Sequence, residues 1–133
     1  MSTFFDSKHV MIHWDASALA VTMQWKRPAQ YQPFRDGLEV AINQVEEAKA
    51  SRVVADHSML NLQDEDEAHF LKQWLPRAAK AGVQRIAVVV PRRQYVQIPK
   101  TRLMQRMKSS GMLLHYFDDM DEARIWVKEA AAA

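Results

Sequence analysis

The sequence predicts an α/β fold: a five-stranded mixed sheet, entered by an N-terminal antiparallel hairpin, with about four helices. Three observations support this. The run 85–91 is apolar, rich in β-branched residues and closed by a proline, as an inner strand covered on both faces requires. Residues 19–25 alternate between apolar and polar, as in a strand with one buried face. Amphipathic helical patterns then separate the later strands, which favours parallel pairing with right-handed crossovers.

The first two strands form the expected hairpin. They span residues 9–14 and 19–25, and the polar gap 15–17 joins them. The connector that follows contains two prolines, which disfavour regular structure inside it. A long amphipathic helix is then expected over about 33–50, where proline suits the first turn and Gly37 slightly weakens the helix.

A third strand is expected over residues 52–56, and a helix should follow from Asp64. Asp64 and Glu67 have the spacing of a capping box, in which two side chains satisfy the free N–H groups of the first turn. Pro76 interrupts the helical pattern, so we expect a kink or a split before Gly82 ends the helix.

The inner strand 85–91 comes next, and three elements complete the chain. Proline opens an expected helix over 99–111, which a glycine ends. Residues 112–117 form the last strand. Asp119 and the acid three residues later repeat the capping pattern at the start of a final helix, expected to reach residue 130.

Length and composition indicate one domain over residues 1–133, large enough to bury its own core. The chain has no cysteine, which excludes disulfides and thiolate chemistry. No apolar run approaches the roughly 20 residues of a transmembrane helix, and the N-terminus lacks the pattern of a signal peptide. We therefore expect a cytoplasmic protein.

The net charge is only +2, but the charges are distributed unevenly. No acidic residue occurs between His69 and Phe117, and every charge in that stretch is a lysine or an arginine. Acidic residues flank the stretch at 64–67 and 118–122. Such asymmetry can mark a surface for an anionic partner, but charge runs usually solvate a surface, which is the interpretation we favour.

Four segments resemble the SpoIIAA-like proteins, small bacterial domains related to the STAS domains of anti-sigma factor antagonists and, in fold, to the CRAL-TRIO lipid-binding domains. The segments are Val53-Val54-Ala55-Asp56, the run 70–76, the run 82–91, and the ending His115-Tyr116-Phe117-Asp118-Asp119 with Trp126 beyond it. The resemblance implies a SpoIIAA-like fold over nearly the whole chain. It also implies a non-enzymatic regulatory domain that binds a protein partner or, as a homodimer, a second copy of itself.

The resemblance does not extend to the phosphorylation motif of that group. In the anti-sigma antagonists, the third strand runs into an Asp-Ser-Ser-Gly-like motif whose serine is phosphorylated. Here Asp56 is followed by His57 and Ser58, and no glycine closes the motif. We therefore do not assign a phosphorylation site to Ser58. The missing motif also argues against the partner-switching role of the anti-sigma factor antagonists.

Asp56, His57 and Ser58, together with Asp64, are the first candidate surface for a ligand or partner. They follow the end of a strand, where ligands often bind in open α/β sheets. The same residue types occur in metal sites and hydrolytic triads, but no metal-ligand spacing is present, and adjacent strand residues point to opposite faces. We predict no catalytic residue, no metal and no cofactor.

Arg92, Arg93 and Tyr95 form the second candidate surface, with two bases beside an aromatic residue. Nucleic acid binding would need more stacking aromatics or a recognition helix, so we do not expect it. A lipid headgroup, an acidic protein surface and plain solvation are the alternatives.

Two functions are open at this point. The first is the regulatory or protein-interaction domain, which rests on the resemblance and on the lack of a catalytic constellation. The second is a carrier or sensor for a lipid or another small apolar or anionic ligand, which rests on the aromatic residues, the interrupted helix and the basic stretch. A deep apolar cavity would favour the second function, and a packed core with an exposed flat patch the first.

Overall fold

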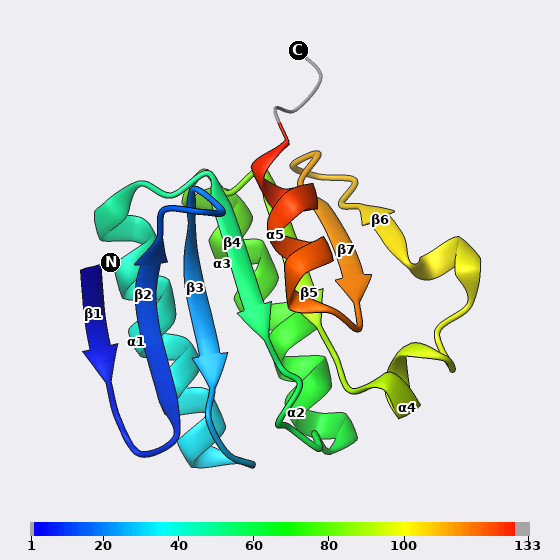
Figure 1. Cartoon of the computed structure of the whole chain (residues 1–133), viewed down its shortest axis with the longest axis horizontal. Helices are drawn as coiled ribbons and strands as arrows, with labels where there is room; N and C mark the ends of the chain where they lie inside the picture. The colour runs from blue at the N-terminus through cyan, green and yellow to red at the C-terminus, as the bar shows by residue number, and fades with distance from the viewer. Residues whose placement is uncertain (1, 130–133) are drawn as a thin grey trace.

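The computed structural model describes residues 2–129 and contains one seven-stranded mixed sheet in the order β1-β2-β3-β4-β5-β7-β6 (Figure 1). Strands β3, β4, β5 and β7 pair in parallel, whereas β1, β2 and β6 each pair antiparallel with a neighbour. The strands are β1 (Ser2–Asp6), β2 (Val10–Asp15), β3 (Ala20–Trp25), β4 (Arg52–Asp56), β5 (Arg85–Val89), β6 (Met104–Arg106) and β7 (Leu113–Phe117).

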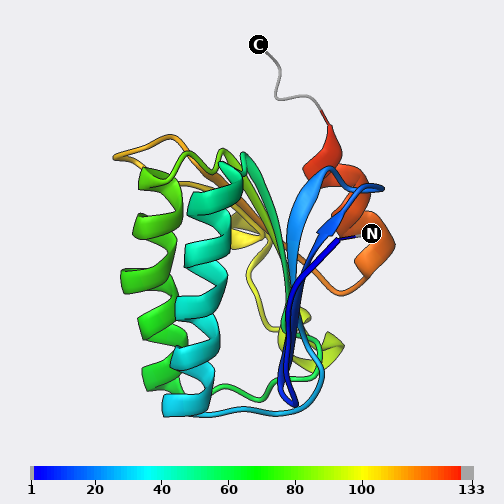
Figure 2. The same cartoon turned by 90° about the vertical axis from the view of Figure 1, so that its left-hand side faces the viewer.

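Helices cover both faces of the sheet. One face carries α1 and a long helix built from α2, a π-helical segment and α3, while α5 lies on the other face (Figure 2). With α4 these make four helices, so the predicted α/β class with a mixed sheet is confirmed. The bounds are α1 (Gln32–Ala48), α2 (Asp64–His69), the π-helical segment η1 (Phe70–Trp74), α3 (Leu75–Lys80), α4 (Arg92–Tyr95), the 3₁₀ turn η2 (Lys100–Arg102) and α5 (Met120–Lys128).

Strand β5 is the inner strand that its sequence predicts. Ile86 and Val88 belong to the core under α1 and the α2–α3 helix, whereas Ala87 and Val89 belong to the smaller core under α5. All four are at most 2% exposed. Residues 86–89 are all apolar because each of the two faces of the strand is covered by helices.

Gly37 sits in the middle of α1 because Trp25 packs against it. A Cβ atom at this position would collide with the Trp25 indole ring. Trp25 in turn packs against Phe34, with ring centroids 5.2 Å apart. The glycine lowers helix propensity, as predicted, but it allows a fully buried tryptophan to lie against the helix backbone.

The prediction of five strands is wrong, because β1 and β6 are also present. The register of β1 against β2 shifts between Thr3 and Phe5, so apolar and polar residues do not alternate regularly along β1. Strand β6 lies inside 99–111, where a helix was expected. There the helix stops after the three residues of η2, and the chain turns back to pair with β7. Backbone pairing at the sheet edge outweighs the helical spacing of the apolar residues.

The interruption expected at Pro76 is present as a change of helix type. The N–H of Leu75 donates to the carbonyl of Phe70, five residues earlier, so a π-helical segment separates α2 from α3. The capping prediction for Asp64 is wrong: Gln63 is the N-cap, and Asp64 is the first helical residue. Asp119 does cap α5, since its Oδ2 accepts the N–H of Glu122 at 3.0 Å. Residue 130, the expected end of that last helix, lies outside the described residues.

Within residues 2–129, no helix has both the length and the apolar character needed to span a membrane.

Candidate functional site

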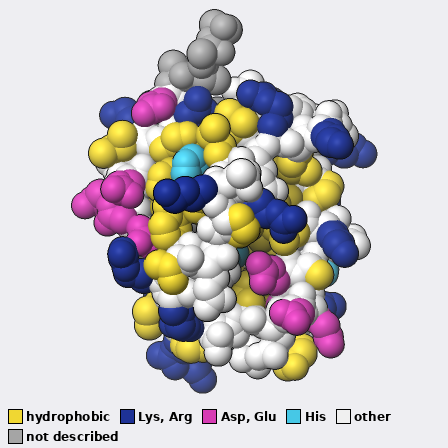
Figure 3. All heavy atoms as spheres, turned by 90° about the vertical axis from the view of Figure 1, so that its right-hand side faces the viewer, with side chains coloured by type: hydrophobic (Ala, Val, Ile, Leu, Met, Phe, Trp, Pro, Cys, Tyr) yellow, Lys and Arg dark blue, Asp and Glu magenta, His cyan; other side chains and the backbone are white. Residues whose placement is uncertain are grey.

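A cavity of about 590 Å³ opens near the carboxyl ends of β4 and β5. Its walls come from the segments that follow these two strands, from α2 and η1, and from β6 and β7. The volume lies within the range of sites that hold small molecules, about 300–1,000 Å³. Figure 3 views the molecule from the side on which α4 and β6 lie, and basic side chains are scattered over this face rather than gathered in one patch.

The mouth of the cavity is cationic. Arg93 on α4 and Arg102 on η2 are exposed there, beside the amides of Gln97 and Gln105. Among residues 2–129, neither arginine forms a salt bridge. Both guanidinium groups are therefore free to bind an anion.

Deeper in the cavity, apolar walls surround one carboxylate and one phenol. Leu62, Leu71 and Ile98 are half-buried and form the apolar part. Glu67 is also half-buried and has no salt-bridge partner in the part of the chain that the structure describes. Burial, and secondly the charge of Glu67, raises the pKa of Tyr116 to about 12, so this phenol keeps its proton at physiological pH.

A small chamber of about 20 Å³ lies next to this inner part, and His57 lines it. Five residues line both the cavity and the chamber, namely Leu62, Glu67, Leu71, Gln94 and Tyr116. His57 is 4% exposed, and its Nε2 atom has no hydrogen-bond partner within residues 2–129. Burial lowers the pKa of His57 to about 3, so the imidazole is neutral at physiological pH.

The alternation of β4 explains why His57 reaches the chamber and its neighbours do not. Ala55 faces the core under α1, so His57, two residues on, lies on the same side of the sheet. Its ring packs edge-on between Phe34 and Phe70, with centroid distances of 6.2 and 4.9 Å. Asp56 instead accepts the N–H of Ser58 at 3.0 Å within the turn.

Of the predicted site residues, the cavity and its chamber bring together only His57 and Arg93. Ser58 and Asp64 are exposed, and neither lines the cavity. Arg92 is also exposed, and it forms a salt bridge with Asp118 at 2.8 Å.

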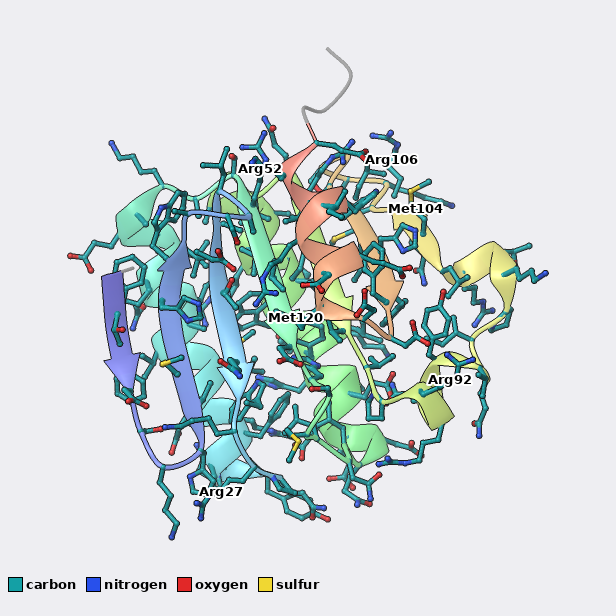
Figure 4. The ribbon with its side chains drawn as sticks, in the orientation of Figure 1. Arg27, Arg52, Arg92, Met104, Arg106 and Met120 are labelled. Atoms are coloured by element: carbon teal, nitrogen blue, oxygen red, sulfur yellow. The ribbon has the colours of Figure 1, made fainter. Side chains whose placement is uncertain are left out.

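Tyr95, the last of the predicted residues, is half-buried and packs against the core. The basic stretch likewise forms no single surface. Arg92 on α4 and Arg106 at the end of β6 lie at opposite ends of this edge of the molecule (Figure 4).

Glu67 and Tyr116 are the residues that sequence reasoning missed. Glu67 had the spacing of a helix-capping partner, and Tyr116 occupied an ordinary strand position. Neither pattern signals a cavity. The nearest signal was the basic stretch, which contains both arginines of the mouth.

Within residues 2–129, no three His, Cys, Asp or Glu side chains are grouped so that they could hold a metal ion. No family model, curated protein or solved structure matches this chain. The SpoIIAA-like assignment therefore stays a prediction from the sequence.

Proposed function

We propose that this domain binds a small organic anion in the cavity and acts as a carrier or sensor rather than as an enzyme. The observation that carries the proposal is a pair of arginines at the mouth of a cavity of about 590 Å³, Arg93 and Arg102, which form no salt bridge in the described part of the chain. A guanidinium group binds a carboxylate or a phosphate through paired hydrogen bonds. The anionic group of the ligand would therefore bind at the mouth.

The apolar walls support the organic part of the ligand. Leu62, Leu71 and Ile98 would cover a hydrocarbon body, and its burial would add about 25 cal/mol for each Å² removed from water. The amide side chains at the mouth can donate and accept hydrogen bonds, which suits a polar head. A small amphiphilic acid thus matches the cavity better than a long-chain lipid or a bare inorganic ion.

A protein-interaction role, alone or as a homodimer, stays a prediction that rests on the SpoIIAA-like resemblance. The packed core is common to any folded domain and does not favour that role specifically. The cavity is a particular feature of this chain, so ligand binding is the function that we put first.

The proposal is tested by calorimetric titration with hexanoate and hexyl phosphate, with hexylammonium and hexanol as charge controls. Arg93→Met and Arg102→Met should each weaken anion binding about five- to tenfold, because each removes a charge-assisted contact. Arg27→Met is the matched control: Arg27 is exposed, lines neither the cavity nor the chamber, and lies away from α4 at the bottom of the view in Figure 4.

Added salt should weaken binding of the anions and leave binding of hexanol unchanged. The proposal fails if neither anion binds. It also fails if the anions bind no more tightly than hexanol, or if the mouth variants bind them as tightly as Arg27→Met does.

A further inference from the structure

We propose that the inner chamber is a second subsite, which takes a hydroxyl or ammonium group at the end of the ligand opposite its anion. The ligand class is then an organic acid with a hydrogen-bond donor at its far end. This inference rests on the proposed function, since it assigns the inner half of the same site.

The unpaired Nε2 atom of His57 is the first argument. Buried polar atoms in folded proteins usually have a hydrogen-bond partner. Seven buried side-chain atoms within residues 2–129 lack one, and Nε2 of His57 is the one that belongs to a residue of the cavity or its chamber, so it calls for an explanation. Packing does not supply one, because the edge-on contacts of the ring with Phe34 and Phe70 leave Nε2 without a hydrogen bond. A nitrogen atom at the wall of a chamber that joins a ligand-sized cavity is explained if the ligand supplies the partner.

Glu67 is the second argument. Its carboxylate lines both the cavity and the chamber and has no salt-bridge partner among residues 2–129. An ionised carboxylate only accepts hydrogen bonds, so it needs a donor. It also repels a second anion, which fixes the direction of the ligand: the acid group binds at Arg93 and Arg102, and the donor group points inward.

The size of the chamber and the charges of the residues that line it determine which end group of the ligand can bind there. The chamber of about 20 Å³ exceeds the roughly 10–15 Å³ that one water molecule needs, so it holds a single polar heavy atom. The neutral imidazole of His57 does not repel an ammonium group, and the phenol of Tyr116 stays protonated beside Glu67. A hydroxyl or an ammonium fits this set, whereas a methyl group would leave Glu67 and His57 without partners.

The experiment compares three acids of equal chain length by calorimetric titration at pH 7: hexanoate, ω-hydroxyhexanoate and ω-aminohexanoate. We expect at least one donor-ended acid to bind about tenfold more tightly than hexanoate, since it gains a hydrogen bond to a charged acceptor. His57→Phe and Glu67→Gln should each reduce that ratio to about threefold or less.

Glu65→Gln is the matched control, because Glu65 is an exposed acid on the same helix. The ratio between donor-ended and methyl-ended acids isolates the inner contact, since a general loss of folding would weaken all three acids alike. Glu67→Gln provides an independent test should His57→Phe fold poorly.

Each outcome decides the question. A tenfold preference for the hydroxy acid or for the amino acid, lost in both variants, supports the subsite and names the donor group. Equal binding of all three acids overturns the subsite and leaves the proposed function standing. If none of the three acids binds, the proposed function and this inference fail together.

Discussion

Asp66 and His57 are two buried polar residues that both contact the start of α1, and their surroundings differ. Asp66 is fully buried, and its Oδ2 atom accepts the N–H of Tyr31 at 2.7 Å. Its Oδ1 atom lies 3.5 Å from Nε of Arg35. His57 is also buried, but it packs between aromatic rings, and no group among the described residues forms a hydrogen bond with its Nε2 atom.

The difference separates a polar group that the fold uses from one that the fold leaves unused. Asp66 holds Tyr31, whose φ of 57° is a strained conformation for a residue with a side chain, at the N-cap of α1. The free energy of this hydrogen bond therefore contributes to the stability of the fold. Burial of the unpaired nitrogen of His57 lowers the stability of the fold, and no hydrogen bond within the described residues compensates for it. For this reason we assign the nitrogen to a ligand.

The largest expected effect is that of Asp66→Ala. Its removal leaves the N–H of Tyr31 without its charged acceptor, and losing such a hydrogen bond to a buried charge costs up to about 3 kcal/mol, whereas the pair with Arg35 adds little because the Arg35 side chain is 38% exposed. We expect a loss of that size in the free energy of unfolding, measured by urea denaturation. Asp66→Asn should lose less, because its side-chain oxygen can still accept the N–H of Tyr31.

Asp64→Ala is the control for this measurement. Asp64 is exposed at the first position of α2, so it should contribute less than about 1 kcal/mol, through the helix dipole. Equal losses in the free energy of unfolding for Asp66→Ala and Asp64→Ala would show that burial and pairing do not distinguish Asp66 from an exposed acid. That result would contradict the contrast between Asp66 and His57.

The second expected effect is a pH dependence that His57 contributes. Its pKa is about 3 in the folded chain and near 6.5 in the unfolded chain. Between these values only the unfolded chain binds the proton, so this contribution to stability is complete above pH 6.5 and is lost as the pH falls. Wild type should therefore lose about 2 kcal/mol more than His57→Phe between pH 8 and pH 5.

Denaturation curves of the two proteins over this pH range test the expectation. Glu67 and Tyr116 line the same chamber, and repeating the comparison in Glu67→Gln separates the contribution of His57 from that of its carboxylate neighbour. Parallel curves for wild type and His57→Phe would mean that the folded chain takes up the proton, and that His57 is not isolated as the structure indicates.

The sequence was sufficient to predict those helices and strands whose structure depends mainly on their own residues. The run 85–91 marks a doubly covered strand because every side chain after Arg85 is apolar, and Asp119 marks a helix start because a cap is a local hydrogen bond. Strands β1 and β6 were not predictable in this way. Their pairing depends on β2 and β7, and the side chains of β6 are all exposed.

The residues of the candidate site also fall into those that the sequence could indicate and those that it could not. His57 could be singled out because it follows a strand end, where ligands bind in this class of fold, and Arg93 because it belongs to a pair of basic residues near an aromatic one. Tyr116 and Glu67 could not, because the segment 92–105 must first fold back against β7. The N–H of Tyr116 donates to the carbonyl of Leu103 at 2.8 Å, a contact between residues 13 positions apart in the printed sequence. Asp66 was hidden too, among four consecutive acids that resemble a solvated helix start.

The smallest expected effect is that of His57→Phe at pH 8, where the proton no longer matters. Phenylalanine keeps the contacts with Phe34 and Phe70 and removes the unpaired nitrogen, so stability should change by less than about 1 kcal/mol and can rise. His57→Ala should lose about 2–3 kcal/mol, because it opens a cavity between the two rings. A loss above about 2 kcal/mol in His57→Phe would show that the imidazole contributes a hydrogen bond to folding. In that case His57 would belong with Asp66, and the argument that its nitrogen is reserved for a ligand would fail.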